Sequence, residues 1–389
     1  MIYWRTGFVV EVTSERSGMQ EVKVELEGGY VDKALHDMSI HPPLCEGDLV
    51  LLNTTAVQLG LGSGGYHFVH AVLSPFKQGT QSNVFEPDMP MSISSPAISR
   101  IPQGHLMKLK YTSLQRAVLS AEEENSPYHH IFVEQHDISG TPVLIGELHS
   151  MLPIAVTWLM ARKPYLRIAY VMSDGGALPI AFSRHVAILK QLSWLSGTVT
   201  YGQAYGGDLE TMNKFTACIA ARHIFKADII IVCMGPGIAG TGTPLGHTGI
   251  EVGELVNCVH MLGGKPIIMP RVSEVDKRQR HVGISHHVLA TLQYAAVCQA
   301  VLPLSAQISA SLERIMKLQL ANIDGFERHE TVWLKEPTVG QLQAALSKYP
   351  VPVASMGRTL YDDPSFFLNV ASAAEYAIRY LDHANIPEE

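Results

Sequence analysis

The sequence lacks several features that would place it in a class of protein at once. It holds no uninterrupted run of about 18 apolar residues, so we expect no membrane-spanning helix. The N-terminus lacks a basic region followed by a long apolar core, which predicts no secretory signal peptide. Its five cysteines form no CxxC pair, and we interpret them as reduced thiols. These absences predict a cytoplasmic protein without a membrane partner.

Positive charge is also scarce. The formal net charge of the 389-residue chain is −7, so bulk attraction to nucleic acid is not expected. Residues 1–75 contain four Lys and Arg against nine Asp and Glu, the wrong balance for a groove that binds phosphates. The composition, 47% hydrophobic and 17% charged, supports a sizeable core and argues against disorder. We therefore expect a folded chain with no nucleic-acid partner.

Catalytic signatures with fixed spacing are missing as well. No HExxH pair occurs, so we assign no metal site, although the 18 histidines leave one open. No GxSxG segment follows an expected strand, which argues against an α/β serine hydrolase. Gly240 is followed by Thr241 instead of lysine, so this glycine-rich segment is not a P-loop. The cofactor, if there is one, stays unknown.

Short alternating segments separated by glycine turns dominate residues 1–75. Strands are expected at 8–13, 21–26, 48–53 and 66–73. Such a series predicts a small all-β barrel domain, which would serve for docking or dimer contact. Residues 76–104, rich in Pro, Ser and Asn, indicate a linker or a long loop.

Apolar segments then alternate with segments of helical periodicity. This rhythm is typical of a mostly parallel sheet covered by helices on both faces. We predict a doubly wound, Rossmann-like α/β domain over residues 105–304 and a C-terminal α/β extension over residues 305–389. Strands are expected at 105–111, 143–146, 166–172, 197–201, 228–234, 266–269, 300–304, 329–335 and 351–356. Helices are expected at 114–124, 150–162, 180–194, 209–225, 250–262, 285–297 and 364–383.

Polar and glycine-rich residues follow these strands where each one ends. The carboxyl ends of parallel strands share one edge, where open α/β sheets bind ligands. Glycines there expose backbone N–H groups that can hold an anion, Thr241 and Thr243 would add hydroxyl donors, and Arg271 would neutralise charge. The candidate ligand-binding residues are His149, Asp174, Gly175, Gly176, Gly206, Gly207, Gly235, Gly237, Gly240, Thr241, Gly242, Thr243 and Arg271.

Candidate acid/base groups lie near the same edge. They are Asp208, Glu210, Glu251 and His286. A structural role competes with a catalytic one, because Asp208 is placed to cap the helix expected at 209–225 and the helix dipole favours Glu210 in its first turn. His286 and His287 are adjacent at a helix start, so we do not expect them to face the same way.

The segment Gly235-x-Gly237-x-x-Gly240 matches a dinucleotide fingerprint in spacing. Its context differs, because Pro244 resists helix and moves the expected helix start to about Thr248, where Glu251 would complete a capping box. The next strand ends at Arg271 instead of an acid that would hold a ribose. We therefore interpret the spacing as incidental to a longer loop that forms the central wall of an anion site.

Three segments stand out along the chain: GDLVLLNTTAVQLGLGSGGYHFV (47–69), AYGGDLETMN (204–213) and MGPGIAGTGTPLGHTGIE (234–251). Together with the β-rich N-terminus, they resemble an uncharacterised bacterial protein family, domain-of-unknown-function family 3866. The resemblance spans nearly the whole chain. It implies a bacterial source and a cytoplasmic location, and it transfers no activity, substrate or catalytic residue.

Three hypotheses for function follow. The favoured one is a protein that binds or acts on a small anionic metabolite, bearing phosphate or carboxylate, at the C-terminal edge of the sheet. The first alternative is an NADP-dependent oxidoreductase, in which Arg271 would accept the 2′-phosphate. The second is a non-enzymatic structural or regulatory homo-oligomer whose barrel docks a partner. The residues do not decide whether the chain is an enzyme.

Overall fold

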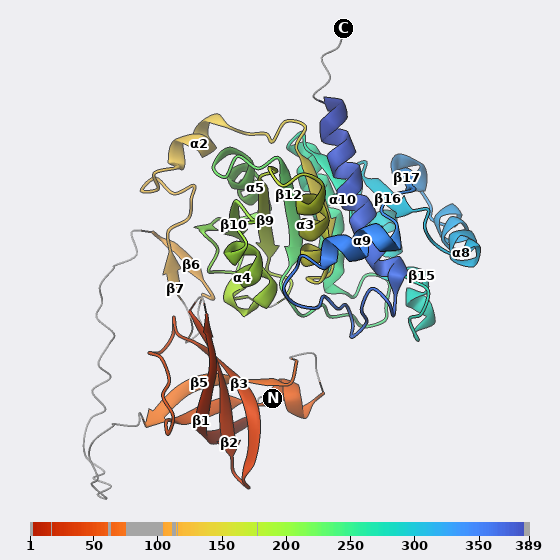
Figure 1. Cartoon of the computed structure of the whole chain (residues 1–389). Coiled ribbons are helices and arrows are strands. Elements are labelled where there is room, and N and C mark those ends of the chain that lie inside the picture. Colours follow the sequence, from red (N-terminus) through yellow and green to blue (C-terminus); the bar gives the residue numbers. More distant parts are fainter. Residues whose placement is uncertain are drawn as a thin grey trace, which may run out of the picture. The chain divides into compact units, whose positions relative to one another are not determined.

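The computed structural model divides the chain into two compact units, residues 1–102 and residues 103–389 (Figure 1). It describes residues 3–16, 18–60, 64–74, 104–110, 114, 116–176 and 178–384. Nearly all of the predicted linker, residues 76–104, lies outside the described residues. No helix within the described ranges is long and apolar enough to cross a membrane.

The first unit is a closed five-stranded barrel, which confirms the small N-terminal all-β fold. Its strands follow the order β1-β2-β3-β5-β4, and β1 pairs with β4 to close it. Alternate residues such as Val22, Val24 and Val50 fill the interior. The elements are β1 (Trp4–Arg16), β2 (Met19–Leu26), β3 (Tyr30–Asp37), β4 (Leu49–Asn53), α1 (Thr55–Gln58) and β5 (Tyr66–Ser74).

The second unit is built on an eight-stranded sheet in which neighbouring strands are parallel. In spatial order the strands are β11 (Leu209–Glu210), β10 (Gly197–Thr200), β9 (Ile168–Ser173), β12 (Ile229–Met234), β8 (Pro142–Gly146), β13 (Lys265–Ile268), β16 (Val301–Ser305) and β17 (Glu330–Leu334). Strands β8, β9 and β12 are buried at every residue, which explains their continuously apolar sequences. The predicted α/β fold is confirmed, and β17 extends the sheet.

Helices cover both faces of this sheet (Figure 1). One face carries α3 (Met151–Arg162), α4 (Arg184–Gln191), α9 (Val339–Leu346) and α10 (Pro364–Ala384). The other carries α5 (Lys214–His223), α6 (Glu251–Met261), α7 (His286–Ala290) and α8 (Ala310–Ala321). Helix α3 is apolar on nearly all sides because the sheet lies beneath it and α10 packs over it.

Smaller elements complete the second unit. Two antiparallel hairpins occur, β6 (Leu106–Lys108) with β7 (Arg116–Val118) and β14 (Val272–Ser273) with β15 (Gly283–Ile284). The short helix α2 (His129–Glu134) packs against the core on the α5 side. Hairpin β14–β15 follows β13, so it lies near the carboxyl edge of the sheet.

Three local predictions are wrong. The helix expected at 114–124 is replaced in part by β7. The strand expected at 351–356 does not form; this segment makes one isolated bridge, Ser355 to Arg358. Strand β3 was not predicted, because only two of its eight residues are buried and the apolar alternation is hidden. In each case contacts with neighbouring segments of the same chain, and not the intrinsic strand or helix propensity of the residues, decide the conformation.

The helix expected at 209–225 begins later, at Lys214. Asn213 caps it by accepting the N–H groups of Phe215 and Thr216, so Asp208 is not the N-cap. Both residue types are good caps, and the sequence alone could not choose between them. Leu209–Glu210 instead form the edge strand β11.

The helix expected at 285–297 is divided. Helix α7 ends at Ala290, and a π-helical turn, Thr291–Ala295, follows it. Asn257 of α6 fixes the end of this turn, since its amide donates to the Ala295 carbonyl at 2.9 Å. The turn therefore packs directly against α6.

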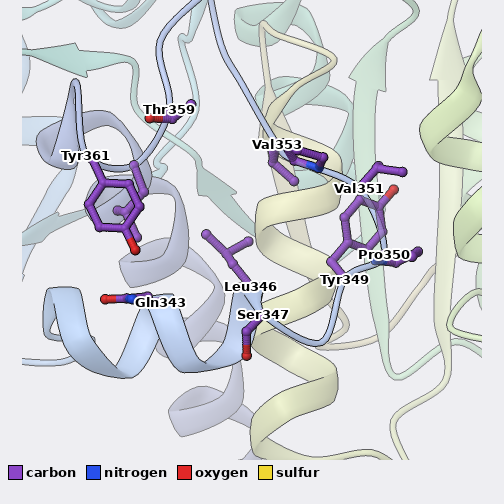
Figure 2. A pocket seen from close by; sticks show the side chains of 11 residues that line it. Gln343, Leu346, Ser347, Tyr349, Pro350, Val351, Val353, Thr359 and Tyr361 are labelled. Atoms are coloured by element: carbon purple, nitrogen blue, oxygen red, sulfur yellow. The ribbon is translucent and has the colours of Figure 1, made fainter.

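A surface pocket of about 420 Å³ opens beside α9 (Figure 2). Its lining comes from residues 343–361 and is mostly aliphatic side chains, prolines and tyrosines. The Tyr349 hydroxyl forms a hydrogen bond with Nδ1 of His185 at 2.9 Å. The pocket offers an apolar concave surface, whereas the titratable residues gather at the strand ends.

Gly253 of α6 tests the close packing against the π-helical turn. A Cβ at this position would lie 2.4 Å from the Ala295 Cβ, so Gly253→Ala should lower the free energy of unfolding by about 1 kcal/mol or more, despite the better helix propensity of alanine. Gly340 of α9 has open space around it, so Gly340→Ala should stabilise by about 0.5 kcal/mol. Urea unfolding of both variants measures the contrast, and stabilisation by both would contradict the packing.

Candidate functional site

The carboxyl ends of β8 and β12 lie where the winding of the sheet reverses. Strand β8 is followed by α3 on one face, and β12 is followed by α6 on the other. Because the two strands are neighbours, the segments that leave them diverge and a crevice opens between them. Glu147 follows β8 directly, and the loop 235–250 follows β12. The fold thus brings both to the position where open α/β sheets bind ligands.

The loop 235–250 folds on itself and not over a helix N-terminus. Gly240 and His247 form an antiparallel bridge, so the residues between them make a small hairpin. Helical structure resumes only at Thr248, well past the third glycine of the GxGxxG spacing. The arrangement differs from a dinucleotide site, in which the helix begins directly over the pyrophosphate. The capping box expected at Thr248 does not form, because the Thr248 hydroxyl accepts the Ala239 N–H instead.

The threonines predicted as ligand donors are engaged within this hairpin. The Thr241 and Thr243 hydroxyls lie 2.9 Å apart, and both also bond the backbone of Gly246. Gly237 and Gly242 take positive φ angles of 119° and 81°, which glycine alone adopts readily. The glycines therefore serve the shape of the loop, and their ligand role stays a prediction.

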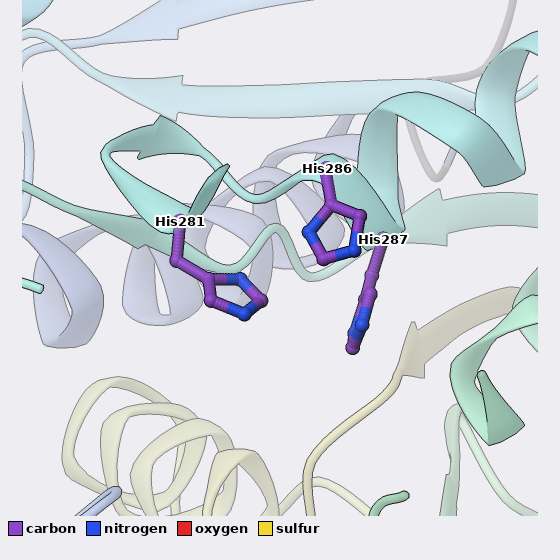
Figure 3. A group of neighbouring side chains, drawn as sticks. All are labelled: His281, His286 and His287. Atoms are coloured by element: carbon purple, nitrogen blue, oxygen red, sulfur yellow. The ribbon is translucent and has the colours of Figure 1, made fainter. Parts of the chain in front are cut away.

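Four histidines gather beside Glu147. His247 comes from the loop after β12, His281 from the turn between β14 and β15, and His286 and His287 from the first turn of α7. The His247 and His287 rings are stacked, with centroids 4.0 Å apart and planes inclined by 3°. Figure 3 shows the rings of His281, His286 and His287 together. The His286 centroid lies 4.8 Å from that of His281 and 4.4 Å from that of His287.

The expectation that His286 and His287 do not face the same way is wrong. Both rings approach His281, whose centroid lies 4.8 Å from His286 and 5.2 Å from His287. The Ser285 hydroxyl caps α7, so the helix begins at His286. This starting point allows the His286 and His287 rings to converge on His281. The hairpin β14–β15 places the His281 ring between the directions in which His286 and His287 point. The two adjacent side chains can therefore both approach it.

Two of these imidazoles are held by hydrogen bonds and two are not. Nδ1 of His287 lies 3.1 Å from a Glu147 carboxylate oxygen, and Nδ1 of His281 lies 2.8 Å from the Ser285 hydroxyl. Neither ring nitrogen of His247 or His286 makes a hydrogen bond of normal geometry with a described residue, although backbone groups of Pro244 and Arg280 lie close to them. His247 is 5% exposed, and a buried polar group without a partner is costly, so a missing ligand is the simplest explanation.

Burial lowers the pKa of three of these histidines, His247, His281 and His286, and so keeps them neutral. It lowers the pKa of His247 to about 4, with the neighbouring His287 adding to the effect. Burial and the charges of Arg271 and Arg278 lower the pKa of His281 to about 3. Burial likewise lowers the pKa of His286. At neutral pH these rings therefore carry lone pairs that can bind a metal ion or accept a proton.

Glu147 is the only acid in direct contact with this cluster in the part of the chain that the structure describes. Burial raises the pKa of its carboxyl, but the hydrogen bond from His287 and the charge of Arg271 outweigh burial, and the net pKa is lowered. One Arg271 nitrogen, Nη1, lies 3.5 Å from Glu147. The carboxylate is therefore ionised and held between a histidine and an arginine.

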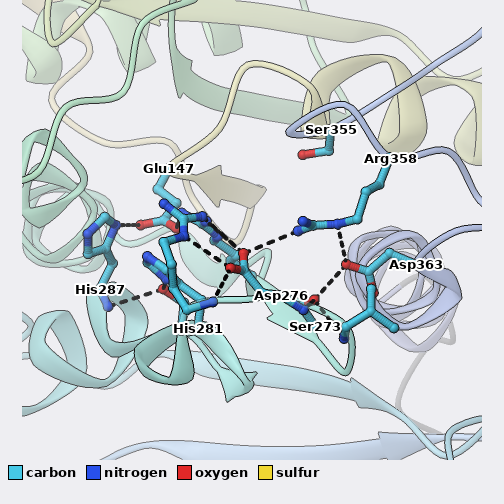
Figure 4. A network of polar contacts seen from close by, with 12 residues as sticks. Glu147, Ser273, Asp276, His281, His287, Ser355, Arg358 and Asp363 are labelled. Carbon is cyan, nitrogen blue, oxygen red and sulfur yellow. Dashed lines mark hydrogen bonds and ion pairs between the residues drawn. The ribbon is translucent and has the colours of Figure 1, made fainter. Parts of the chain in front are cut away.

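Arg271 joins this cluster to a second polar network. Figure 4 shows Asp276, Arg358 and Asp363 of that network. The other Arg271 nitrogen, Nη2, lies 3.7 Å from Asp276, which Arg278 and Arg358 approach more closely, at 3.0 and 3.2 Å. Arg358 also contacts Asp363 at 3.1 Å. Within the described residues, the buried Nη2 of Arg271 has no hydrogen-bond partner. The residue predicted to bind an anion is thus buried and faces a carboxylate on both sides, and its contact with Asp276 is too long for a hydrogen bond.

Two glycines allow the loop to approach the cluster. A Cβ on Gly249 would lie 2.7 Å from a Glu147 carboxylate oxygen and 3.2 Å from Nδ1 of His247. A Cβ on Gly240 would lie 3.1 Å from Nε2 of His287. Both positions therefore favour glycine because a larger side chain lacks space. The contact of Gly240 with His287 could not be predicted from the sequence.

Two overlapping groups of side chains could hold a metal ion. One is Glu147, His247 and His287, and the other is His281, His286 and His287. Within each group the potential ligand atoms lie within 4.8 Å of one another. No fixed spacing along the chain links these residues, which is why a motif search found no metal site.

The candidates Asp208 and Glu210 lie at the β10–β11 edge of the sheet, away from the histidines. Asp208 accepts the backbone N–H of Thr198 at 2.9 Å and pairs with Lys190. Glu210 accepts the Thr200 hydroxyl at 2.7 Å and contacts the fully buried Lys108 at 3.3 Å. Their observed contacts stabilise the edge strand, and a catalytic role stays a prediction.

Gly206 and Gly207 accompany these acids. The Gly206 N–H donates to Glu210 at 2.6 Å, and the Gly207 N–H donates to the Thr200 hydroxyl at 3.1 Å. Both amides, predicted to cradle an anion, are used within the β10–β11 connection. This loop is not brought to the histidine cluster, because β9 separates β10 from β12 in the sheet.

Asp174, Gly175 and Gly176 lie closer to the crevice, after β9. Asp174 accepts the Gln203 N–H at 2.9 Å. A Cβ on Gly175 would lie 3.3 Å from a Glu251 carboxylate oxygen, and one on Gly176 would lie 2.4 Å from the Gly235 carbonyl oxygen. Glu251 accepts the Tyr201 hydroxyl. The segment 174–176 therefore packs against the start of the loop 235–250, at Gly235, on the side that faces β9.

His149 is a buried link between elements. Its Nε2 lies 2.5 Å from the Ser183 hydroxyl, and its Nδ1 lies 3.2 Å from the Met234 carbonyl. Ser183 also caps α4, so this pair fastens the end of β12 to that helix. Burial and the nearby His185 lower the pKa of His149 to about 4. These contacts give His149 a structural role, and its ligand role stays a prediction.

A family model described as "Protein of unknown function (DUF3866)" matches residues 33–374 of this chain. The matched range contains β4, β5 and part of β3 of the barrel, the whole eight-stranded sheet and every residue of the histidine cluster. No curated protein and no solved structure matches the chain.

Lys108 provides a test of the structural role of Glu210. Burial raises the pKa of Glu210 and lowers that of Lys108, so each charge depends on the other. Lys108→Met should lower the free energy of unfolding by about 3 kcal/mol, because it leaves a buried carboxylate without its partner. The exposed Lys110 is the control, and Lys110→Met should change stability by less than about 0.5 kcal/mol.

The double variant Lys108→Met with Glu210→Gln should recover part of this loss in urea unfolding, because it removes the unpaired charge. Equal effects of the two single lysine substitutions, or no recovery in the double variant, would contradict the pairing and leave Glu210 available for chemistry.

Proposed function

This chain belongs to the DUF3866 family of proteins of unknown function, and we propose that it binds a small metabolite bearing a phosphate or carboxylate group in the crevice between β8 and β12. The observation that carries the proposal is Nη2 of Arg271. It is buried and donates no hydrogen bond to any described residue, and the Asp276 carboxylate lies 3.7 Å away. Arg271 follows β13 and reaches Glu147 at the end of the neighbouring strand β8. A guanidinium N–H group that makes only a long ion-pair contact can still donate a hydrogen bond to a carboxylate or phosphate oxygen.

Two histidines of the cluster around Glu147 add to this support. His247 and His286 make no hydrogen bond of normal geometry with a described residue, and a neutral imidazole can donate one hydrogen bond to an anion through its N–H. The exposed residues of the loop 235–250 lie on the solvent side of the cluster. A ligand that enters beneath this loop would satisfy groups that are otherwise buried without partners.

The charge balance limits how such a ligand is held. Three arginines (Arg271, Arg278 and Arg358) face three carboxylates (Glu147, Asp276 and Asp363) across the network. Their formal charges cancel, so bulk electrostatic attraction is weak and directed hydrogen bonds must supply the affinity. The ligand is therefore expected to be small, with its anionic group bound end-on to Arg271.

His247 gives the site a further polar group. Its ring is neutral at pH 7, because burial lowers its pKa to about 4, so it can form hydrogen bonds with a bound substrate but is only a weak base. Glu147 contacts the stacked His287 and not His247 itself. We therefore propose that His247, which is grouped with Glu147 and His287, contacts the bound ligand as a hydrogen-bonding group.

The test is a binding measurement with inorganic phosphate and malonate on the full chain. Thermal shift and calorimetry should show stabilisation that grows with ligand concentration, as binding to the native state requires. Arg271→Lys keeps the charge between Glu147 and Asp276 but loses the planar fork, and it should weaken phosphate binding at least about tenfold, or about 1.4 kcal/mol.

Arg280 is the matched control, because it is an exposed arginine of the same segment. Arg280→Lys should leave phosphate binding unchanged. The proposal fails if neither anion binds, or if both arginine substitutions weaken binding equally. NADP⁺ belongs in the same series, because tight NADP⁺ binding without phosphate or malonate binding would favour an oxidoreductase instead.

A further inference from the structure

We propose that His281, His286 and His287 form a binding site for one divalent transition metal ion, with zinc as the expected ion. The site goes beyond the proposed anion binding and stands on separate observations, namely the positions and partners of three imidazoles. Nothing in the sequence pattern assigned a metal, because the three ligands come from the end of a hairpin and the first turn of the following helix.

The distances bring three nitrogen ligands to one point. The potential ligand atoms of the three side chains lie within 4.8 Å of one another, and Figure 3 shows the rings grouped around a common space. In a tetrahedral zinc site with bonds near 2 Å, ligand nitrogens lie roughly 3.3 Å apart. Side-chain rotations that move each nitrogen by about 1 Å would complete the site.

The ring orientations favour this group over the alternative one. The planes of His281 and His287 are perpendicular, and those of His286 and His287 are inclined by 56°, so their lone pairs can converge. In the alternative group, His247 and His287 are stacked with planes inclined by only 3°, so their lone pairs run side by side. Glu147, the third member of that group, is already engaged by His287 and Arg271.

The hydrogen bonds of the cluster are those of metal-binding histidines. Nδ1 of His281 contacts the Ser285 hydroxyl, and Nδ1 of His287 contacts the Glu147 carboxylate. Such partners fix the ring and leave Nε2 as the ligand atom, and a carboxylate also makes the ring more basic. His286 completes the set, since neither of its nitrogens makes a hydrogen bond of normal geometry with a described residue.

Space for an ion comes from Gly240. A Cβ there would lie 3.1 Å from Nε2 of His287, the atom that the Glu147 contact leaves for a metal. Three imidazoles suit zinc, and three protein ligands leave a coordination position for water or substrate. An ion would add two positive charges beside a network whose charges otherwise cancel, so it would also attract an anion to the crevice.

The experiment uses the full chain, produced without a histidine tag, stripped with a chelator and titrated with Zn²⁺ and separately with Co²⁺. Calorimetry should show one equivalent of Zn²⁺, and Co²⁺ should give the visible absorption bands of a tetrahedral, nitrogen-rich site. His286→Ala should weaken Zn²⁺ binding about 100-fold or more. It breaks no hydrogen bond of normal geometry between described residues, and only a backbone group of Arg280 lies close to the ring, so the variant should fold.

Three further variants separate a metal site from a general loss of structure. His260 is exposed near the end of α6, and His260→Ala should bind Zn²⁺ as the unchanged chain does. Ser285→Ala should weaken binding about tenfold, as expected for an outer-shell partner. Gly240→Ala should also weaken it, because the added methyl group occupies the space beside His287.

The proposal is overturned if the unchanged chain binds no Zn²⁺, or if His286→Ala binds it as tightly as His260→Ala does. It is also overturned if His247→Ala abolishes binding while His286→Ala preserves it, because the ion would then belong to the Glu147 group. Phosphate titrations with and without Zn²⁺ keep the two proposals apart. Zn²⁺ binding without phosphate binding supports the metal site alone, and the reverse result supports anion binding alone.

Discussion

The buried carboxylate of Glu147 is the interaction on which the arrangement of the strand ends depends. It leaves β8 at the centre of the sheet and contacts His287 of α7 at 3.1 Å and Arg271, just after β13, at 3.5 Å. An unpaired carboxylate at this depth would be strongly destabilising, so the three elements that supply its partners must meet in one geometry. The contact therefore fixes where α7 begins, and with it the positions of the other histidines.

Close approach of the backbone is the second requirement. Gly249 lies against Glu147 and His247, Gly240 lies against His287, and Gly253 of α6 lies against the π-helical turn that continues α7. In each case a methyl group would fall within about 3 Å of an atom of the site or of its support. The glycines of the loop 235–250 thus matter as much for the space they leave as for the turns they permit.

Much of the fold was predictable because its signal is local. Strands β8, β9 and β12 are buried on both faces, so their sequences are continuously apolar, and the helices between them show a clear period. Strands β3 and β7 were missed because their pairing partners, and not their own residues, stabilise them, whereas β6 lies within the strand expected at 105–111. The start of α5 was misplaced because Asp208 and Asn213 are both good caps, and only the contact of Asp208 with Thr198 decides between them.

The sequence by itself determined the doubly wound sheet, the carboxyl edge where its loops gather, and the presence there of Arg271 and a glycine-rich loop. Those features follow from apolar periodicity and chain order. Only the tertiary structure decided which polar residues meet. It placed Asp208 and Glu210 at the sheet edge and drew His247, His281, His286 and His287 around Glu147. The reason is physical: periodicity records which face of an element is buried, whereas the meeting of side chains distant in the chain depends on how loops pack once the sheet has formed.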